Sequence, residues 1–581
     1  MAWYDEAVFY HIYPLGLTGA PKQNDYGEPV HRLNTLVPWI DHLKKIGVNA
    51  LYIGPLFESV GHGYETTDYK KLDSRLGTNE DLTNFVKKCH DAGIRVILDG
   101  VFNHTGRDFF AFKDIREKRE GSAYRDWYCN VNFYGNNEYN DGFSYENWGG
   151  YNLLVKLNQR NPAVKDYICD VIRFWVKEFD IDGLRLDAAD VLDFEFMKDL
   201  RRTADSVKPD FWLMGEVIHG DYSRWANANT LHSVTNYTLH KGLYSGMNDH
   251  NFFEIAHTIR YTNGMISRAI RLYNFVDNHD VERIITKLKN KAHFTPVHIM
   301  LFTLPGIPSI YYGSEFGIEG RKEQFSDDSL RPYIDLKEHA KDYEKNPCTK
   351  LITALGRIHK EYRQDLTSED YRELCLTNRQ FAYGRGRLVV AVNNDDNAAE
   401  INVPAADGEY IGLLYGEKLT ASGGRLQIRI QPNNGEIYAP AEGGKAKSSK
   451  LSVTEIKTAG PDAKEEQKAS EKKPEQKSAE AKAPGQKSAG AKAPDPKTAE
   501  ATKSGQKPDE KKKQERTKQE KAQKETVPVP DIPYEEMTVE QLQAVILAKM
   551  AKNGPVTDQM RKDVEDNIWH NSLVNWANSF R

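Results

Sequence analysis

Cysteine is scarce in this sequence. The 581 residues contain five cysteines, an odd number, widely spaced and without a CxxC pair. This usage excludes a disulfide framework and a thiolate metal site, and it is typical of a protein kept in a reducing compartment. We therefore expect a cytoplasmic protein.

Long apolar runs and a leader pattern are also lacking. The N-terminus carries Asp5 and Glu6 where a signal peptide would carry Lys or Arg, and no apolar core follows them. The most apolar stretch, His298–Gly313, is interrupted by prolines and is too short to span a bilayer. The formal net charge of −5 excludes a surface made throughout for nucleic acid. We expect a soluble protein with neither a membrane nor a nucleic acid as partner.

Aromatic residues are absent from residues 441–530, where Lys, Ala, Pro, Glu, Gln and Ser dominate. Such a segment buries too little apolar surface to offset the entropy lost on ordering. We predict a disordered linker over 441–530. It is interpreted as a flexible spacer, with a weakly basic tether to an acidic surface as the alternative.

Helical periodicity returns in residues 531–581. Apolar residues recur at three- and four-residue spacing at Leu542, Val545, Ile546 and Met550. Thr538 is placed to cap this helix, Gly554–Pro555 ends it, and a second amphipathic run covers 557–580. We predict a helical hairpin of unknown role. Contact with an unknown protein and packing on the main body are both open.

The first 365 residues alternate short apolar segments with longer amphipathic ones. The apolar segments predict eight strands: Val8–Ile12, Ala50–Ile53, Val96–Leu98, Gly183–Leu186, Trp212–Met214, Ser233–Asn236, Leu272–Val276 and Ser309–Tyr312. The helical segments between them include Leu33–Ile46, Asn79–Ala92, Pro162–Phe179 and Asp193–Val207. Strands that are apolar along their whole length are typical of parallel sheets covered on both faces. We predict an α/β fold, a (β/α)₈ TIM barrel over residues 1–365.

Two further units accompany the predicted barrel. Residues 105–157, after the third strand, are rich in Asn, Tyr and Trp and too long for an ordinary βα loop. They predict a small inserted subdomain over the barrel mouth. Residues 366–440 alternate apolar and polar residues between Gly and Asn turns, which predicts a C-terminal antiparallel β-sandwich.

Polar residues gather at the ends of the predicted strands. Active sites of this fold form at the C-terminal strand ends, where the sequence offers Asp99, Asn103, His104, Arg185, Asp187, Glu216, His279 and Asp280. Carboxylates on neighbouring strands about 5–5.5 Å apart suit retaining glycoside cleavage, with one as nucleophile and one as acid/base. Arg185, two residues before Asp187, is placed to keep that carboxylate ionised.

Eight short motifs occur in order along the chain: GVNALYIGP (Gly47–Pro55), HGYETTDY (His62–Tyr69), DGVFNH (Asp99–His104), KLNQRNP (Lys156–Pro162), GLRLD (Gly183–Asp187), GEV (Gly215–Val217), FVDNHD (Phe275–Asp280) and GIPSIYYGSE (Gly306–Glu315). Together they make the chain resemble the alpha-amylase family (glycoside hydrolase family 13) over roughly residues 3–440. The resemblance implies a catalytic barrel, a domain inserted after strand three and a C-terminal β-sandwich.

The resemblance also implies roles for single residues. Asp187 matches the family's nucleophile, Glu216 its general acid/base and Asp280 its transition-state stabiliser. The residues that match the lining of the subsite of the cleaved glucose are Tyr64, His104, Arg185 and His279, with His62 at a neighbouring position. Asp99 matches a supporting position, and Asp328 and Arg331 match residues that contact the next sugar outward.

Departures from the family pattern bear on specificity. Endo-acting alpha-amylases carry Lys-His three and four residues after the nucleophile, where this chain has Asp190 and Val191. The KLNQRNP and SVTNYTLHKGL stretches resemble the neopullulanase and cyclomaltodextrinase branch, although that branch usually carries an N-terminal β domain and here the barrel pattern begins at once. Asn103 matches a calcium ligand of the family, but its acidic partners are not identifiable, so we expect no metal and no cofactor.

These observations predict a retaining alpha-glucan hydrolase that cleaves α-1,4 bonds of maltodextrins, with an oligosaccharide as its substrate. An alpha-glucan transglycosylase or a sucrose- or trehalose-type isomerase would use the same residues and stays open. A non-catalytic glucan-binding scaffold is disfavoured, because all three carboxylates are present.

Overall fold

The computed structural model describes residues 2–267, 269–324, 326–441, 446–452, 537–553 and residue 564. The chain divides into two units, Met1–Lys473 and Pro474–Arg581. Each unit is described by itself. No helix within the described ranges is long and apolar enough to cross a lipid bilayer.

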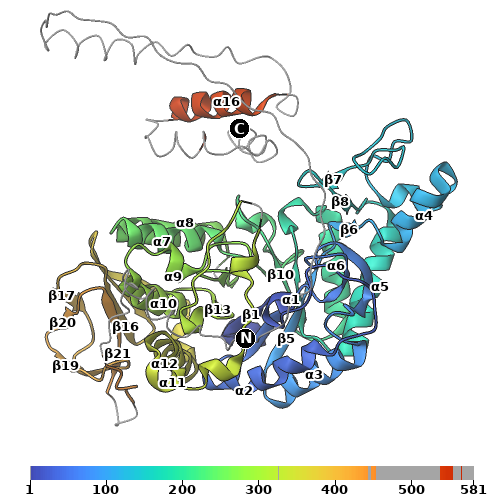
Figure 1. Ribbon diagram of the computed structural model, residues 1–581. Coiled ribbons are helices and arrows are strands. Elements are labelled where there is room, and N and C mark those ends of the chain that lie inside the picture. The colour runs from blue at the N-terminus through green and yellow to red at the C-terminus, as the bar shows by residue number, and fades with distance from the viewer. Residues whose placement is uncertain are drawn as a thin grey trace, which may run out of the picture. The chain divides into compact units, whose positions relative to one another are not determined.

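Eight parallel strands form the centre of the first unit, and all eight strands predicted from the sequence are confirmed (Figure 1). They are β1 (Phe9–Ile12), β2 (Ala50–Ile53), β5 (Arg95–Gly100), β9 (Gly183–Leu186), β10 (Trp212–Gly215), β11 (Ser233–Val234), β12 (Tyr273–Asn274) and β13 (Ile307–Tyr311). Their order is β11-β10-β9-β5-β2-β1-β13-β12. A parallel bridge between Thr235 and Tyr273 joins the two ends, so the sheet closes into the predicted barrel.

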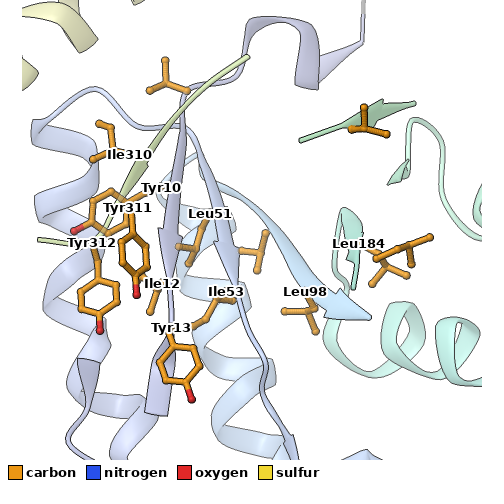
Figure 2. Close-up of a cluster of buried hydrophobic side chains, with 14 of the residues drawn as sticks. Tyr10, Ile12, Tyr13, Leu51, Ile53, Leu98, Leu184, Ile310, Tyr311 and Tyr312 are labelled. Atoms are coloured by element: carbon orange, nitrogen blue, oxygen red, sulfur yellow. The ribbon is translucent and has the colours of Figure 1, made fainter. Parts of the chain in front are cut away.

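Side chains alternate between the two faces of the barrel wall because successive Cβ atoms of a strand point to opposite sides. The inner face is filled by Phe9, Ala50, Tyr52, Ile97, Trp212, Met214, Tyr273 and Ile307. The outer face packs against the helices, and Figure 2 shows part of this cluster, with Tyr10, Ile12, Leu51, Ile53, Leu98 and Leu184 labelled. Because Leu184 and Leu186 face outward, Arg185 between them faces the barrel interior.

Helices surround the strands (Figure 1). The α-helices of the barrel and its connections are α1 (Pro14–Leu17), α2 (Val37–Lys45), α3 (Asn79–Asp91), α5 (Pro162–Phe179), α6 (Phe194–Val207), α7 (Tyr237–Asn248), α8 (Phe252–Met265), α9 (Ile284–Lys287), α10 (Phe294–Thr303), α11 (Asp342–Lys345), α12 (Pro347–Glu361) and α13 (Arg363–Leu366). The predicted helix Leu33–Ile46 is divided into a 3₁₀ turn, Arg32–Leu36, and α2. Pro38 explains the division, since proline has no N–H to donate and suits the first turn of an α-helix.

The segment between β5 and α5 folds separately from the barrel wall. It contains α4 (Phe110–Lys118) and a three-stranded antiparallel sheet of β6 (His104–Gly106), β7 (Asn147–Trp148) and β8 (Tyr151–Lys156) in the order β6-β8-β7. These elements occupy the region predicted as an inserted subdomain. A shorter insertion, the hairpin of β3 (Phe57–Ser59) and β4 (Thr66–Leu72), follows β2.

Two antiparallel sheets follow the barrel, as predicted. One contains β14 (Tyr371–Leu376), β15 (Gln380–Arg385), β16 (Leu388–Asn393), β18 (Gly408–Gly412), β19 (Lys418–Ala421) and β21 (Asn434–Pro440), and the other pairs β17 (Ala399–Pro404) with β20 (Arg425–Ile430). The two faces of β16 have different partners: Val389 and Ala391 pack within the sandwich, whereas Val390 and Val392 join the core shared with the barrel.

The first unit continues past residue 441, where the sequence predicts the linker to begin. The N–H of Ser449 donates to the Leu413 carbonyl at 2.8 Å, and the N–H of Leu451 donates to the Leu414 carbonyl at 2.9 Å. Leu451 also packs against the hydrophobic core. The polar composition of residues 441–530 did not predict this contact. Residues 442–445 and 453–530 of the predicted linker lie outside the described residues.

In the second unit the structure describes one helix, α16 (Val539–Asn553). Its start agrees with the predicted cap, because the Gln541 N–H donates to Thr538 Oγ1 at 3.3 Å and the Thr538 N–H donates to Gln541 Oε1 at 2.8 Å. The predicted apolar positions Leu542, Val545 and Ile546 are buried together. The predicted second helix, apart from Val564, lies outside the described residues.

Trp175 of α5 packs against the segments that leave the C-terminal end of the barrel. Its ring stacks on Phe57 with centroids 4.3 Å apart and on Phe102 with centroids 5.7 Å apart. Its Nε1 donates to the Tyr69 carbonyl at 2.6 Å, and its side chain is fully buried. Phe57 and Tyr69 flank the turn that carries Tyr64, and Phe102 precedes His104.

Replacing Trp175 with Ala is expected to lower the free energy of unfolding by about 3–5 kcal/mol, because a large cavity would replace the indole. Trp175→Phe keeps most of the ring stacking and is the matched control, with a smaller expected loss. Urea unfolding followed by circular dichroism measures both. A loss below about 1 kcal/mol for the Ala variant would contradict this role.

Candidate active site

Arg185 lies at the centre of a carboxylate cluster at the C-terminal end of the barrel. Its Nη1 donates to Asp187 Oδ1 at 2.9 Å and to Asp99 Oδ1 at 3.0 Å. Its Nη2 lies 2.8 Å from Glu216 Oε2, an atom that also accepts the Ala188 N–H at 3.0 Å. Asp187 and Glu216 therefore bind neighbouring nitrogens of one buried guanidinium.

The register of three adjacent strands produces this cluster. Asp99 of β5 is paired with Arg185 of β9, and Arg185 is paired with Met214 of β10. Asp187 and Glu216 follow two residues after Arg185 and Met214, so each repeats the inward direction of its strand. Three strands that are far apart in the sequence thus bring their polar ends to one point.

Three carboxylates share the single cation of Arg185. Burial raises the pKa of Asp187 well above its usual value, and although Arg185 opposes the shift, the charges of Glu216 and Asp99 add to it. A cluster with more negative charge than its cation neutralises retains a proton more readily than an isolated carboxylate. The attraction of Arg185 lowers the pKa of Asp187 but does not outweigh burial, so the expectation that Arg185 keeps this carboxylate ionised is met only in part.

A second set of contacts links the cluster to Asp280. Tyr64, in the turn of the β3–β4 hairpin, donates from its hydroxyl to Asp99 Oδ2 at 3.2 Å and lies 2.5 Å from His279 Nε2. The same Nε2 of His279 lies 3.0 Å from Asp280 Oδ2. The structure therefore brings together Arg185, Asp187, Glu216, Tyr64, His279 and Asp280, as the sequence predicts.

Arg331 binds Oδ1 of Asp280, the carboxylate oxygen that His279 does not contact. Its Nη2 donates to Asp280 Oδ1 at 2.8 Å and its Nε donates to the His279 carbonyl at 3.0 Å. Burial by itself would raise the pKa of Asp280, but His279 and Arg331 outweigh it and hold that pKa well below its usual value. Asp280 is therefore kept ionised.

Asp328 and Arg331 do not pair with each other. The Asp328 carboxylate pairs with Lys22, and the partner of Arg331 is Asp327, with Oδ2 3.1 Å from Nη2. Asp328 begins the 3₁₀ turn Asp328–Leu330, and Asp327 precedes it.

Replacing Arg331 with Gln is expected to lower kcat/KM by about 10- to 100-fold, because a charge-assisted bond to Asp280 is lost. The pKa of Asp280 then rises toward its usual value. Since the reaction needs the ionised carboxylate, the acid limb of the pH profile of kcat/KM moves to higher pH. Arg331→Lys keeps the charge and is expected to keep the limb near its original position. An unmoved acid limb in the Gln variant would contradict this assignment.

His104 and His62 lie at the edge of this network. The Nδ1 of His104 lies 3.3 Å from Asn103 Nδ2, and its buried Nε2 has no hydrogen-bond partner within the described ranges. Burial lowers the pKa of His104 to about 3, so its ring is neutral. The side chain of His62 is 48% exposed, with Nε2 3.3 Å from Glu65 Oε1.

Two tyrosines of the site were not predicted. Tyr52 of β2 donates to Asp99 Oδ2 at 2.8 Å. Tyr237 donates to Glu216 Oε1 at 3.4 Å and accepts a hydrogen bond from Asn278 Nδ2 at 3.1 Å. Alternation along β2 could have placed Tyr52 on the inner face of the barrel. Tyr237 could have been predicted because it follows shortly after β11, the sixth barrel strand.

Asp190 occupies a 3₁₀ turn, Ala189–Val191, directly after the nucleophile position. Burial raises its pKa to about 7, and the charge of Glu216 adds to the shift. Where endo-acting relatives of the family carry a lysine, this chain therefore places a carboxyl group close to Glu216.

The residues present do not fit a calcium site. Asn103 is fully buried, and its Oδ1 accepts a hydrogen bond from Gln159 Nε2 at 3.3 Å. Across the described part of the chain, no three His, Cys, Asp or Glu side chains form a group that could hold a metal. No step of the reaction below is assigned to a metal, and the absence of a cofactor stays a prediction.

Comparisons with known proteins agree with this geometry. Residues 24–363 match the alpha amylase catalytic domain. The chain is 31% identical over 462 residues to a cyclomaltodextrinase of Thermoanaerobacter pseudethanolicus, covering 75% of this chain and 78% of the relative. It is also 31% identical over 473 residues to neopullulanase 2 of Thermoactinomyces vulgaris, with the same shares covered.

Among solved structures, a debranching enzyme of Nostoc punctiforme is similar, with a TM-score of 0.66 and 26% sequence identity. The similarity covers 75% of this chain and 98% of that one. The sequence motifs, the barrel and the matched domain agree with one another. This chain therefore belongs to the alpha-amylase family.

Proposed function

We propose that this protein is a retaining alpha-glucan hydrolase that cleaves α-1,4-glucosidic bonds of maltodextrins. One observation supports this proposal most strongly: Asp187 and Glu216 bind adjacent nitrogens of Arg185 at the barrel mouth, so both face one small volume. The similarity to cyclomaltodextrinase and neopullulanase supports the substrate class. The oligosaccharide would enter from the open C-terminal end of the barrel.

In the first step, Glu216 in its protonated form donates its proton to the glycosidic oxygen that leaves. Asp187 attacks the anomeric carbon, and the carbon–oxygen bond to the departing sugar breaks as the glucosyl ester forms. Positive charge develops on the sugar ring meanwhile. Asp280, kept ionised by Arg331 and His279, lies where it can stabilise that charge.

In the second step, Glu216 accepts a proton from water and the resulting hydroxide attacks the anomeric carbon. The ester bond to Asp187 breaks, and the carboxylate returns to its bond with Arg185. Two displacements at one carbon restore its configuration, which is the meaning of retention. His104 is assigned to a hydroxyl of the bound glucose, in line with its match to the family.

We assign the protein to the cytoplasm, supported by its five cysteines, which are all free thiols. The steps above use side chains of this chain alone, and we propose no cofactor. A protein contact made by the C-terminal helical segment remains a proposal.

Product analysis tests the proposed reaction. The purified full chain is incubated separately with maltoheptaose, β-cyclodextrin, pullulan and sucrose, with Asp187→Asn as the inactive control. Shorter maltodextrins that first appear as the α-anomer support the proposal, and opening of the cyclodextrin supports the cyclomaltodextrinase branch. Longer or rearranged products would show that the enzyme transfers glucosyl groups to a sugar instead of hydrolysing the bond. No turnover of any substrate, or a β-anomeric first product, would overturn the proposal.

A further inference from the structure

The order of the barrel strands indicates the direction in which a glucan crosses the barrel mouth. In the closed sheet, β10 and β1 are four strands apart in both directions, so they face each other across the barrel. Glu216 directly follows β10 and protonates the departing oxygen in the proposed reaction, so the leaving sugar lies on its side. The sugars on the non-reducing side of the cleaved bond therefore extend toward the segments that follow β13, β1 and β2.

Hydrogen bonds and an ion pair join these three segments into one wall of the mouth. Arg75 donates from Nη1 to the Lys22 carbonyl at 3.2 Å and to the Gly61 carbonyl at 2.7 Å, and so ties the segment after β1 to the β3–β4 hairpin. The side chain of Lys22 pairs with Asp328, in the segment after β13. Three segments that are far apart in the sequence therefore form one surface opposite the proton donor.

Lys322 is an accessible cation of this wall and lies close to Asp280. Its Nζ donates to the Asp280 carbonyl at 3.0 Å and lies 3.7 Å from Asp327 Oδ1, and its side chain is 54% exposed. An ammonium group has three N–H donors, so hydrogens remain for a ligand. Arg331 and Asp328, which the family pattern assigns to the next sugar outward, already have partners within the chain. Lys322 is therefore placed to donate to a hydroxyl of that sugar.

Tyr333 offers an aromatic surface further along the same wall. It follows Arg331 by two residues and is 64% exposed, whereas the next residue, Ile334, is buried. Gly19, just after α1, lies against one side of the ring, since a Cβ there would come within 3.2 Å of the Tyr333 Cδ2 atom. The other side of the ring is open to solvent. The C–H groups of a pyranose form an apolar face that packs on such a ring, so Tyr333 is suited to a sugar further out.

We propose that Lys322 and Tyr333 bind the glucan on the non-reducing side of the cleaved bond, Lys322 through a hydroxyl of the second sugar and Tyr333 by stacking on the third. Both assignments rest on the proposed function, and they give the protein a preference for chains that extend to a third sugar on that side. These contacts are the same before and in the transition state, so they lower KM with little effect on kcat.

The α-fluorides of glucose, maltose and maltotriose test both assignments on the full chain, because they share one leaving group and differ only in the sugars on the non-reducing side. In the unaltered protein, kcat/KM for fluoride release is expected to rise with each added sugar. Lys322→Met is expected to lower the gain from the second sugar at least about fivefold. Any effect that this variant has through Asp280 acts on all three fluorides and cancels in the ratio. Tyr333→Ala is expected to lower the gain from the third sugar at least about threefold, and Tyr333→Phe to keep it.

Two exposed residues near the C-terminal ends of outer helices are the matched controls, since these helix ends lead to the opposite end of the barrel. Lys87→Met removes a lysine of α3 that pairs with Asp91, and Tyr261→Ala removes a tyrosine of α8 that is 52% exposed. Both variants are expected to keep both gains.

The results that would overturn the assignments are distinct from those that would overturn the hydrolase. If the unaltered protein gains nothing from the added sugars, or if Lys322→Met or Tyr333→Ala leaves its gain unchanged, the residue concerned does not bind the glucan and hydrolysis stands. If fluoride is released from none of the three compounds and maltoheptaose is not cleaved, the proposed function and both assignments are wrong.

Discussion

Asp187→Asn is expected to lower kcat on maltoheptaose by about 10⁴- to 10⁶-fold, the loss typical of removing an attacking group. The asparagine keeps the size of the side chain and an oxygen for Arg185, but its amide does not form the glucosyl ester. A 10⁴-fold loss corresponds to about 5.4 kcal/mol of activation free energy. KM is expected to change little, because the contacts assigned to sugar hydroxyls come from other residues. Initial rates of reducing-sugar release measure both constants.

Asp190→Asn is the matched control for this variant. It removes the same formal charge three residues further along and close to Glu216, yet the mechanism gives its carboxyl group no bond to make. Its kcat is expected to stay within about tenfold of the original value. If Asp187→Asn kept more than about a tenth of the activity, Asp187 would not be the nucleophile.

Glu216→Gln is expected to lower kcat on maltoheptaose by about 10²- to 10⁴-fold, because the departing sugar then leaves without a proton. With α-maltosyl fluoride as substrate, the rate of the first step is expected to fall much less, since fluoride leaves without protonation. The second step still lacks its base, so the glucosyl ester accumulates. A burst of fluoride release followed by slow turnover is therefore the expected time course, measured with a fluoride electrode.

Tyr237→Phe serves as the control for Glu216→Gln. It removes a hydroxyl 3.4 Å from Glu216 Oε1 and leaves the carboxyl group in place, so the two substrates are expected to be affected alike and by less than about tenfold. Equal losses on maltoheptaose and on the fluoride in Glu216→Gln would assign Glu216 to binding in place of proton transfer.

Local patterns in the sequence were sufficient for the barrel and for most of the site. Eight apolar segments predicted eight strands, because strands buried on both faces need apolar residues throughout. Alternation along a strand then fixes which residues face inward, and this placed Arg185 and Asp187 together. The capping of α16 by Thr538 was likewise predictable, since a cap and its partner are three residues apart.

Local patterns did not predict the contacts between segments that are far apart in the sequence. The sequence does not show that Tyr237 reaches Glu216, or that Asp327 and not Asp328 pairs with Arg331. The sequence by itself determined which elements form and which residues face the barrel interior, because these depend on neighbours a few residues away. Only the tertiary structure decided which charges are paired, because the partner of a buried charge is set by the packing of segments far apart in the chain.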